Sequence, residues 1–308
     1  MFLRLDEYHR PGELATALAL LRRPGVVTRP LAGGTELVGA VDDVTQAVVD
    51  LGRLGLDRLA VQEGWAHFGA MLTLQELMST DHGLELLQTA ARHTAPRTIR
   101  QAATLGGVLA GKRADGDLTV ALLALQAQVT LQAAGGPADA TTPTDPRTVE
   151  LYEFLDRREQ ILPGALITQV SIPQLPTGTA VSWQRVARTP ADRSIVSCAV
   201  VVAAEEVRIA LGGVAPLPMR LRVIEARVRE ALRANQVPPA DRMPGSPPAA
   251  RMAAGAAAQI AAAAEAATRD AVDPPGDFRG SRDYRRHVAG VLVRRALLEV
   301  WNEGGDRR

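Results

Sequence analysis

The sequence predicts a mixed α+β fold arranged in two domains. The chain has 308 residues, which is about twice the length of a typical domain. Segments with apolar residues at helical spacing are interspersed with short, β-branched apolar runs of the kind that form strands. The composition changes at about residues 173–178. We therefore expect one domain over residues 1–175 and a second over residues 176–308.

The first half of the chain is expected to mix helices and strands. Residues 12–22 have the pattern of an amphipathic helix, which Pro24 and Gly25 end. Thr73 and Glu76 have the spacing of a helix N-cap with a capping box. Further helices are expected over residues 83–93 and 118–125, with a helix or turn over 36–41. Strands are expected over residues 26–32, 47–51, 59–61, 66–70 and 128–131, with a hairpin turn at Glu63 and Gly64.

The second half is expected to contain more strands, a short helix and three longer helices. Residues 134–146 are rich in Gly, Pro, Thr and Asp and predict an exposed loop. Residues 149–155, 166–172 and 180–187 are expected to form a short helix and strands. After the boundary we expect strands over residues 194–203 and 206–212, helices over 219–233, 250–270 and 281–302, and a Pro-rich linker over 237–248.

The composition excludes several kinds of site. The formal net charge of +1 gives no sign of a nucleic-acid surface. Cys198 is the only cysteine, so no disulfide or cysteine-ligated metal cluster can form within the chain, and its apolar surroundings predict a buried strand position. The five histidines are scattered and form no metal-binding pattern. No secretory leader and no membrane span are visible, so we expect a cytoplasmic protein.

Two glycine pairs, each beside a threonine, are the strongest functional signal. The first is Gly33 and Gly34, followed by Thr35; the second is Gly106 and Gly107, preceded by Thr104. Glycine lets backbone N–H groups approach an anion, and threonine adds a hydroxyl donor. A single pair is more often a tight turn. Two such loops could together grip the two ends of a pyrophosphate.

Neither loop has the usual nucleotide-binding pattern. A Rossmann site needs G-x-G-x-x-G, and a P-loop needs a lysine after its last glycine. Lys112 is the only lysine, and it is not in a P-loop pattern.

Several segments resemble the FAD-binding medium subunit of the molybdenum hydroxylases, the carbon monoxide dehydrogenase and xanthine dehydrogenase group. Residues 32–37 are similar to A-G-G-T-D/E-L, residues 99–107 to I-R-N-x-A-T-I-G-G, and residues 68–73 to I-G-A-x-x-T. In the second domain, residues 183–197 are similar to Y-x-K-V-x-R-x-A-x-D-x-A-I-V-S and residues 209–220 to I-A-x-G-G-V-A-P-x-P-x-R. Residues 284–297 are similar to the closing Y-R-R-x-L…L-x-R-R-A-L.

The resemblance implies a fold and an activity. The fold is an FAD-binding α/β domain of the PCMH type with subdomains at about residues 1–58 and 59–175, then a smaller domain with a three-stranded antiparallel sheet and helices. The activity is electron transfer in a heterotrimer that can dimerise. Flavin takes electrons from iron–sulfur clusters on a small subunit, which receive them from a molybdopterin-binding large subunit. The flavin then passes them to an external acceptor.

The resemblance also implies roles for single residues. Gly33, Gly34 and Thr35 would contact the pyrophosphate, and Thr104, Gly106 and Gly107 would clasp it from the other side. Glu36 would hold a polar part of the cofactor, or is an exposed acid at a helix start. Asp117 would bind cofactor hydroxyls, or caps the following helix. Trp183 would lie near the flavin ring, or packs against its sheet. The expected loop contacts also include Ala32, Leu37 and Ala110.

The second loop departs from the family pattern G-G-N-L-A-N-A-S-P. Val108 replaces the first asparagine and has no polar atom in its side chain. Gly111 replaces the second, and Arg113 and Ala114 replace Ser-Pro. Lys112 and Arg113 bring positive charge that compensates, or they are a solvated pair. The two missing asparagines leave open the alternative of a flavin-free assembly subunit. A free-standing flavin reductase with another partner is a third possibility.

Overall fold

In the computed structural model, the chain forms two compact units. The structure describes residues 5–40, 44–111, 116–135, 143–190, 192–203, 206–235 and 255–302. The N-terminal unit comprises residues 1–82, 95–114 and 126–174, and the C-terminal unit comprises residues 83–94, 115–125 and 175–308. Two helical segments from the first half of the sequence therefore belong to the C-terminal unit.

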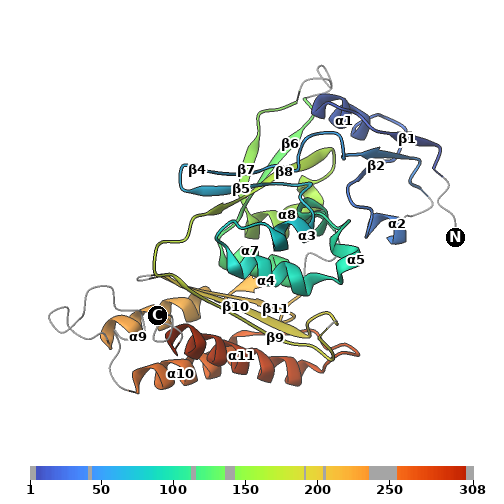
Figure 1. Ribbon diagram of the computed structural model, residues 1–308. Helices are drawn as coiled ribbons and strands as arrows, with labels where there is room; N and C mark the ends of the chain where they lie inside the picture. Colours follow the sequence, from blue (N-terminus) through green and yellow to red (C-terminus); the bar gives the residue numbers. More distant parts are fainter. Residues whose placement is uncertain are drawn as a thin grey trace. The chain divides into compact units, whose positions relative to one another are not determined.

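The N-terminal unit begins with a small parallel sheet (Figure 1). Its strands are β1 (Glu7–His9), β3 (Ala47–Asp50) and β2 (Thr28–Leu31), in that spatial order. Helix α1 (Leu14–Leu21) buries Ala17 and Leu18 against Val49 and Leu51 of this layer. A short helix, α2 (Leu37–Ala40), follows the first glycine pair. The sheet thus places the end of β2, and the loop after it, beside a packed core.

A five-stranded antiparallel sheet forms the rest of this unit. Its spatial order is β4 (Leu59–Gln62), β5 (Trp65–Gly69), β8 (Ala165–Pro173), β6 (Gln128–Ala133) and β7 (Arg147–Glu150). Glu63 and Gly64 both have positive φ, 51° and 79°, as a tight hairpin turn between twisted strands requires. The predicted hairpin turn is confirmed. Arg22 joins the two sheets by donating to the carbonyls of Ala134 and Gly135 at 2.8 and 2.7 Å.

Four helices complete the N-terminal unit: α3 (Leu74–Ser79), α5 (Arg97–Arg100), α6 (Leu105–Ala110) and α8 (Leu151–Ile161). The predicted capping box is confirmed, since the Thr73 hydroxyl accepts from the Glu76 amide at 3.2 Å and the Glu76 carboxylate accepts from the Thr73 amide at 2.8 Å. The second glycine pair was expected to be a loop. It lies instead within α6, so that expectation was wrong.

The C-terminal unit is built on an antiparallel sheet ordered β12 (Met219–Arg220), β11 (Glu206–Gly212), β10 (Val196–Ala203) and β9 (Ala180–Val186). The three long strands are those expected from the sequence, and the two-residue β12 adds a fourth. Because Met219 and Arg220 pair with β11, helix α9 (Arg222–Ala234) begins later than the predicted residue 219.

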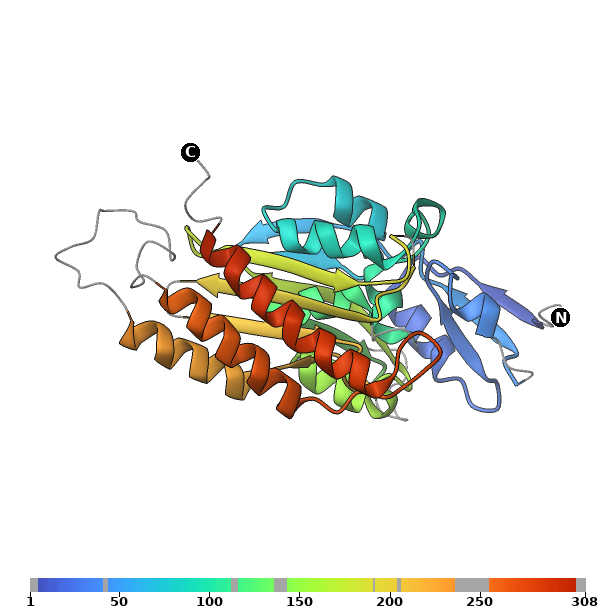
Figure 2. The same cartoon turned by 90° about the horizontal axis from the view of Figure 1, so that it is seen from below.

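Helices cover both faces of this sheet (Figures 1 and 2). Helices α10 (Ala256–Ala271) and α11 (Arg282–Asn302) pack on one face, where Val200, Ile209 and the fully buried Trp301 share one core. Helices α4 (Glu85–Thr94) and α7 (Asp117–Ala124) contact the sheet as well. The predicted Pro-rich linker lies outside the described residues.

Successive side chains of strand β9 point to opposite faces of the sheet. Ser182 and Gln184 bond the Glu299 carboxylate of α11, so they face the α10–α11 side. Arg185 contacts His93 of α4 at 3.1 Å and therefore faces the opposite side. The α4–α7 face of the sheet thus carries the charged side chain of Arg185.

Candidate functional site

The first glycine loop connects β2 to α2 and packs tightly on the segment before α6. Ala32, Gly33, Gly34, Thr35 and Glu36 form this loop, and Leu37 is the first residue of α2. A Cβ on Gly33 would lie 1.6 Å from the carbonyl oxygen of Ala102, and Gly34 has φ +70°. Only glycine fits at Gly33 without moving backbone, and glycine is strongly favoured at Gly34.

The amides of this loop are available to a ligand. Within the described part of the chain, the structure records no hydrogen bond donated by the backbone N–H groups of Gly33, Gly34 and Thr35. Thr35 is exposed, and the two glycines are partly exposed. A run of successive unpaired N–H groups around a glycine with positive φ is the kind of concave site that binds phosphate oxygens.

The second glycine pair has a different local role. Thr104 is the N-cap of α6, and its hydroxyl accepts from the Gly107 amide at 3.1 Å. The Gly106 amide donates to the carbonyl of Ala70 at 2.8 Å, and a Cβ on Gly106 would lie 2.8 Å from the Ala70 Cβ. These amides are therefore used within the protein. The Thr104 hydroxyl, which accepts in the cap, still has a proton to donate.

The first glycine loop touches the C-terminal end of α6 at Glu36 and Gly111. A Cβ on Gly111 would lie 2.0 Å from Oε2 of Glu36, so the Glu36 side chain fills the space that an asparagine would need. Gly111 ends α6, and its carbonyl accepts from Arg158 at 3.0 Å. Glu36 is partly buried, which does not fit the alternative of an exposed helix-start acid.

The remaining residues of the second loop divide into buried and exposed positions. Val108 is only 8% exposed and packs in the core, whereas Ala110 is exposed. Val108 therefore fits its position as an apolar residue. Lys112, Arg113 and Ala114 lie outside the described residues.

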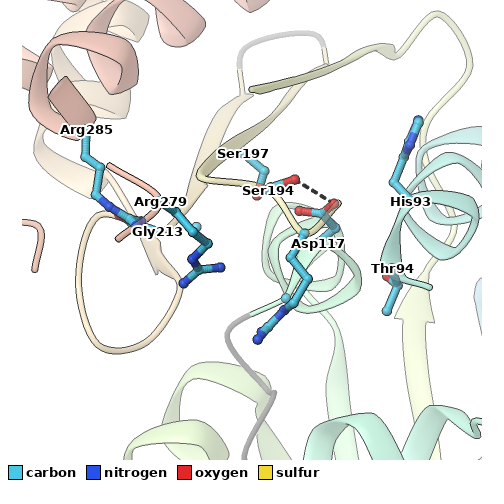
Figure 3. Close-up of a pocket in the computed structure, with 11 residues that line it drawn as sticks. His93, Thr94, Asp117, Ser194, Ser197, Gly213, Arg279 and Arg285 are labelled. Carbon is cyan, nitrogen blue, oxygen red and sulfur yellow. Dashed lines mark hydrogen bonds between the residues drawn. The ribbon is translucent and has the colours of Figure 1, made fainter. Parts of the chain in front are cut away.

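Asp117 is the predicted site residue that lies in a pocket of the C-terminal unit (Figure 3). Gly116 is the N-cap of α7 and Asp117 its first residue, so the alternative that Asp117 caps the helix is wrong. Its carboxylate instead accepts from the Ser194 hydroxyl at 2.8 Å and lies 3.7 Å from Nε of Arg185. Asp117 thus ties α7 to the sheet.

Burial controls the ionisation of Asp117. The side chain is 5% exposed, and burial raises the pKa of the carboxyl above its usual range. Hydrogen bonds from Ser194 and Ser197 and the charge of Arg185 act in the opposite direction without cancelling the effect.

Trp183 lies on the α4–α7 face of β9, in alternation with Ser182 and Gln184. It is paired in register with Ala199 of β10 and is partly buried. Its indole Nε1 is buried and has no hydrogen-bond partner among the described residues. This position fits the sheet-packing alternative, and the buried donor leaves room for a polar contact as well.

The pocket also contains residues that sequence reasoning did not single out. Around Asp117 lie the side chains of His93, Ser194, Ser197, Arg193, Arg279 and Arg285. Ser197 and Arg285 lie in segments that resemble the family, but no role was expected for them. Nothing in the sequence indicates that Arg279, far along the chain, reaches the same pocket as Asp117.

Other reactive groups give no sign of chemistry. Cys198 is fully buried, and burial raises the pKa of its thiol well above the usual range, which fits a core residue rather than a nucleophile. Among the described residues no group of three or more His, Cys, Asp and Glu side chains is placed to hold a metal ion.

Comparison with known families identifies the cofactor. Residues 3–175 match the family model of the FAD binding domain in molybdopterin dehydrogenase, and residues 249–300 match the CO dehydrogenase flavoprotein C-terminal domain. The chain belongs to this FAD-binding family. It is an FAD-binding subunit of the dehydrogenases related to molybdopterin dehydrogenases, and its cofactor is FAD.

Characterised relatives resemble the chain over nearly its whole length. The carbon monoxide dehydrogenase medium chain of Hydrogenophaga pseudoflava is 28% identical over 307 residues, 96% of each chain. The nicotine 6-hydroxylase medium subunit of Paenarthrobacter nicotinovorans is 28% identical over 314 residues, covering 97% of this chain and 99% of the relative. The chain is therefore similar to medium subunits of multi-subunit enzymes.

Solved structures share the fold. The reconstituted CO dehydrogenase from Oligotropha carboxidovorans superposes with a TM-score of 0.77 at 26% identity, covering 98% of this chain and 99% of that one. Quinoline 2-oxidoreductase from Pseudomonas putida 86 gives 0.76 at 21% identity, covering 99% of each chain, and shares the fold. The mixed helix-and-sheet fold class is confirmed. In the described residues, no helix is long and apolar enough to cross a membrane.

Proposed function

We propose that this FAD subunit carries electrons within a heteromeric molybdenum hydroxylase. Electrons would reach it from an iron–sulfur small subunit, which receives them from a molybdopterin-binding large subunit, and would leave to an external acceptor. The relatives named as medium chains of such enzymes support this assignment. We expect the complex in the cytoplasm, as one heterotrimer or a dimer of heterotrimers.

The observation that carries the proposal is the set of available amides in the first glycine loop. The N–H groups of Gly33, Gly34 and Thr35 would hold the pyrophosphate, with the Thr35 hydroxyl as a further donor. FAD supplies the electron-carrying chemistry, and the protein supplies binding and position. Ala32 and Leu37 flank these donors and would fix the loop through packing.

The second glycine pair would contribute mainly because it has no side chains. Because the amides of Gly106 and Gly107 are already engaged, we propose that these glycines allow close packing beneath the pyrophosphate. The Thr104 hydroxyl would donate to an oxygen, and the exposed Ala110 would contact the cofactor. Glu36 would bind a cofactor hydroxyl while packing on Gly111.

In the C-terminal unit, Asp117 and Trp183 would contact the cofactor. Asp117 would hydrogen-bond cofactor hydroxyls, and its carboxylate already accepts from the Ser194 hydroxyl at 2.8 Å. The buried Trp183 Nε1 would gain a partner it lacks within the described residues. The domain division at about residue 175 and the subdomain division at about residue 58 also remain predictions.

The alternative of a flavin-free assembly subunit rested on the loss of two asparagines, at Val108 and at Gly111. Because Val108 packs in the core, its lack of a polar atom is no defect at that position. This favours the electron-carrying assignment over the assembly role. Whether the chain is instead a free-standing flavin reductase depends on whether it binds partner subunits.

Co-expression with the genes beside this one tests the assignment. The expected result is co-purification with a cysteine-rich iron–sulfur subunit and a large subunit, and bleaching of flavin absorbance after substrate is added without oxygen. A flavin-loaded chain that binds neither subunit would instead support the free-standing reductase.

A further inference from the structure

The pocket around Asp117 has the chemistry of an oxyanion site (Figure 3). Three guanidinium groups line it, those of Arg193, Arg279 and Arg285, together with the hydroxyls of Ser194 and Ser197. Among the residues that the structure describes, Asp117 is the only carboxylate in the lining, and no aliphatic side chain contributes to it. Such a surface suits a small charged group and not a flat apolar ring.

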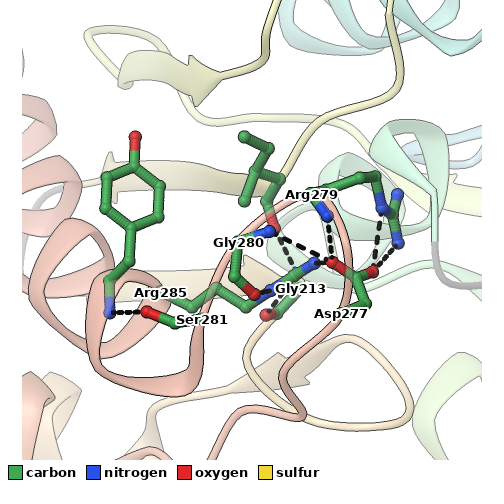
Figure 4. Close-up of polar contacts among 8 residues, drawn as sticks. Gly213, Asp277, Arg279, Gly280, Ser281 and Arg285 are labelled. Atoms are coloured by element: carbon green, nitrogen blue, oxygen red, sulfur yellow. Dashed lines mark hydrogen bonds and ion pairs between the residues drawn. The ribbon is translucent and has the colours of Figure 1, made fainter.

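Arg285 builds the frame of this pocket (Figure 4). Its side chain is 3% exposed, and its guanidinium donates to the carbonyls of Ile195 at 2.6 Å and Gly213 at 3.1 Å. It also pairs with Asp277 at 2.6 Å. A Cβ on Gly213, whose φ is +77°, would lie 2.1 Å from the Ile195 carbonyl oxygen. Arg285 therefore fixes the strand ends around the pocket.

Arg279 is the cation that the frame presents to the pocket. Its Nε and one terminal nitrogen lie 2.9 and 2.8 Å from Oδ2 of Asp277, and Asp277 also accepts from the Arg279 amide at 2.9 Å. The Arg279 side chain is 24% exposed, so it is held in place and still reaches solvent. A planar guanidinium restrained in this way is preorganised to bind a phosphate, sulfonate or carboxylate.

We propose that this pocket binds the oxyanion group of a small electron acceptor that reoxidises the subunit. The inference rests on the proposed function, because Asp117 links the pocket to the cofactor only if it contacts FAD. A quinone acceptor would take up two electrons from the reduced cofactor and two protons, and leave as the hydroquinone. The arginines would bind its charged group and take no part in the electron transfer.

The test compares two acceptors that differ in one charged group, naphthoquinone and naphthoquinone sulfonate. The FAD-loaded full chain is reduced without oxygen by light with EDTA as the electron donor, and flavin reoxidation is followed at increasing acceptor concentration. In Arg279→Gln the half-saturating concentration of the sulfonate should rise about tenfold, as expected for loss of a charged contact, and that of the neutral quinone should not change. Arg282→Gln is the matched control, since this exposed arginine pairs with Asp273 and does not line the pocket.

A binding measurement gives a second readout that needs no electron transfer. Titration calorimetry with naphthalenesulfonate should show binding to the oxidised protein and to Arg282→Gln, and binding about tenfold weaker to Arg279→Gln. NAD⁺ as a further acceptor distinguishes a nucleotide phosphate from another anion as the natural source of the charge.

Equal effects of Arg279→Gln on both quinones, or no effect on either, would overturn the proposed pocket. A chain that takes up no FAD would instead contradict the proposed function, and the absorbance spectrum recorded before each experiment separates the two failures.

Discussion

Gly33 is the residue at which the first glycine loop packs most tightly on the segment before α6. The carbonyl of Ala102 occupies the position that any side chain at Gly33 would need. Family resemblance and local chemistry both single out this glycine, but the sequence suggests only that its amide meets an anion. The structure adds that the missing side chain lets the loop rest on the segment before α6.

Gly33→Ala should therefore cost stability and FAD binding together. Overpacking against backbone destabilises by about 1–3 kcal/mol, and displacement of the loop should remove most of the FAD affinity. Thermal unfolding and an FAD titration measure the two effects. Gly39→Ala is the control, since a Cβ there meets nothing within 4 Å. Equal behaviour of the two variants would show that the loop does not rest on Ala102.

Gly111→Ala should act through Glu36. The new Cβ meets mainly the end of the flexible Glu36 side chain, with the Gly107 carbonyl oxygen 3.0 Å away, so the protein should remain folded while the Glu36 carboxylate moves. We expect FAD affinity to fall about tenfold, and to fall no further when Gly111→Ala is added to Glu36→Ala. Such a cycle isolates the coupling between the two residues. Additive losses would mean that Glu36 and Gly111 act independently.

Asp117 predicts a pH dependence of stability. Its pKa is raised by burial, so above the ordinary value of 3.8 the native state binds a proton that the unfolded state has lost. This stabilising contribution is complete below the unfolded pKa and is lost as the pH rises through the folded pKa. Asp117→Asn should thus gain stability relative to the natural protein as the pH rises through that window. Parallel denaturant titrations that show a constant difference would contradict the assignment.

Among the secondary-structure elements, helix α6 is one that its glycine motif did not predict. Thr104, Gly106 and Gly107 predict a loop from their composition, since glycine disfavours helix interiors. The structure forms a helix because Thr104 caps it and because Gly106 packs closely on Ala70. Contacts of this kind, between segments far apart in the chain, are absent from local patterns. The capping box at Thr73 needs no such contact and could be predicted.

Thr73→Ala should destabilise the protein by about 1 kcal/mol through loss of this cap. Thr73→Ser keeps the hydroxyl and should restore most of the difference. Chemical denaturation of the two variants measures it. If both lose the same stability, the cap of α3 contributes through packing and not through its hydrogen bonds.

At the scale of the whole molecule, helices α4 and α7 show the limit of sequence reasoning. Both were predicted as helices from residues in the first half of the chain, but they belong to the C-terminal unit with β9, β10 and β11. Which unit a helix joins depends on tertiary packing. For the same reason the sequence could name Asp117 but not Ser194, Arg279 and Arg285 as its neighbours in the pocket.

We propose that this chain holds FAD through its first glycine loop and carries electrons with it. The most direct measurement is the absorbance spectrum of the purified full chain, followed by heat release and identification of the flavin. We predict the bands of an oxidised flavin and release of FAD in one-to-one ratio with the protein. A colourless chain that stays colourless after incubation with excess FAD would contradict the account and favour the assembly role.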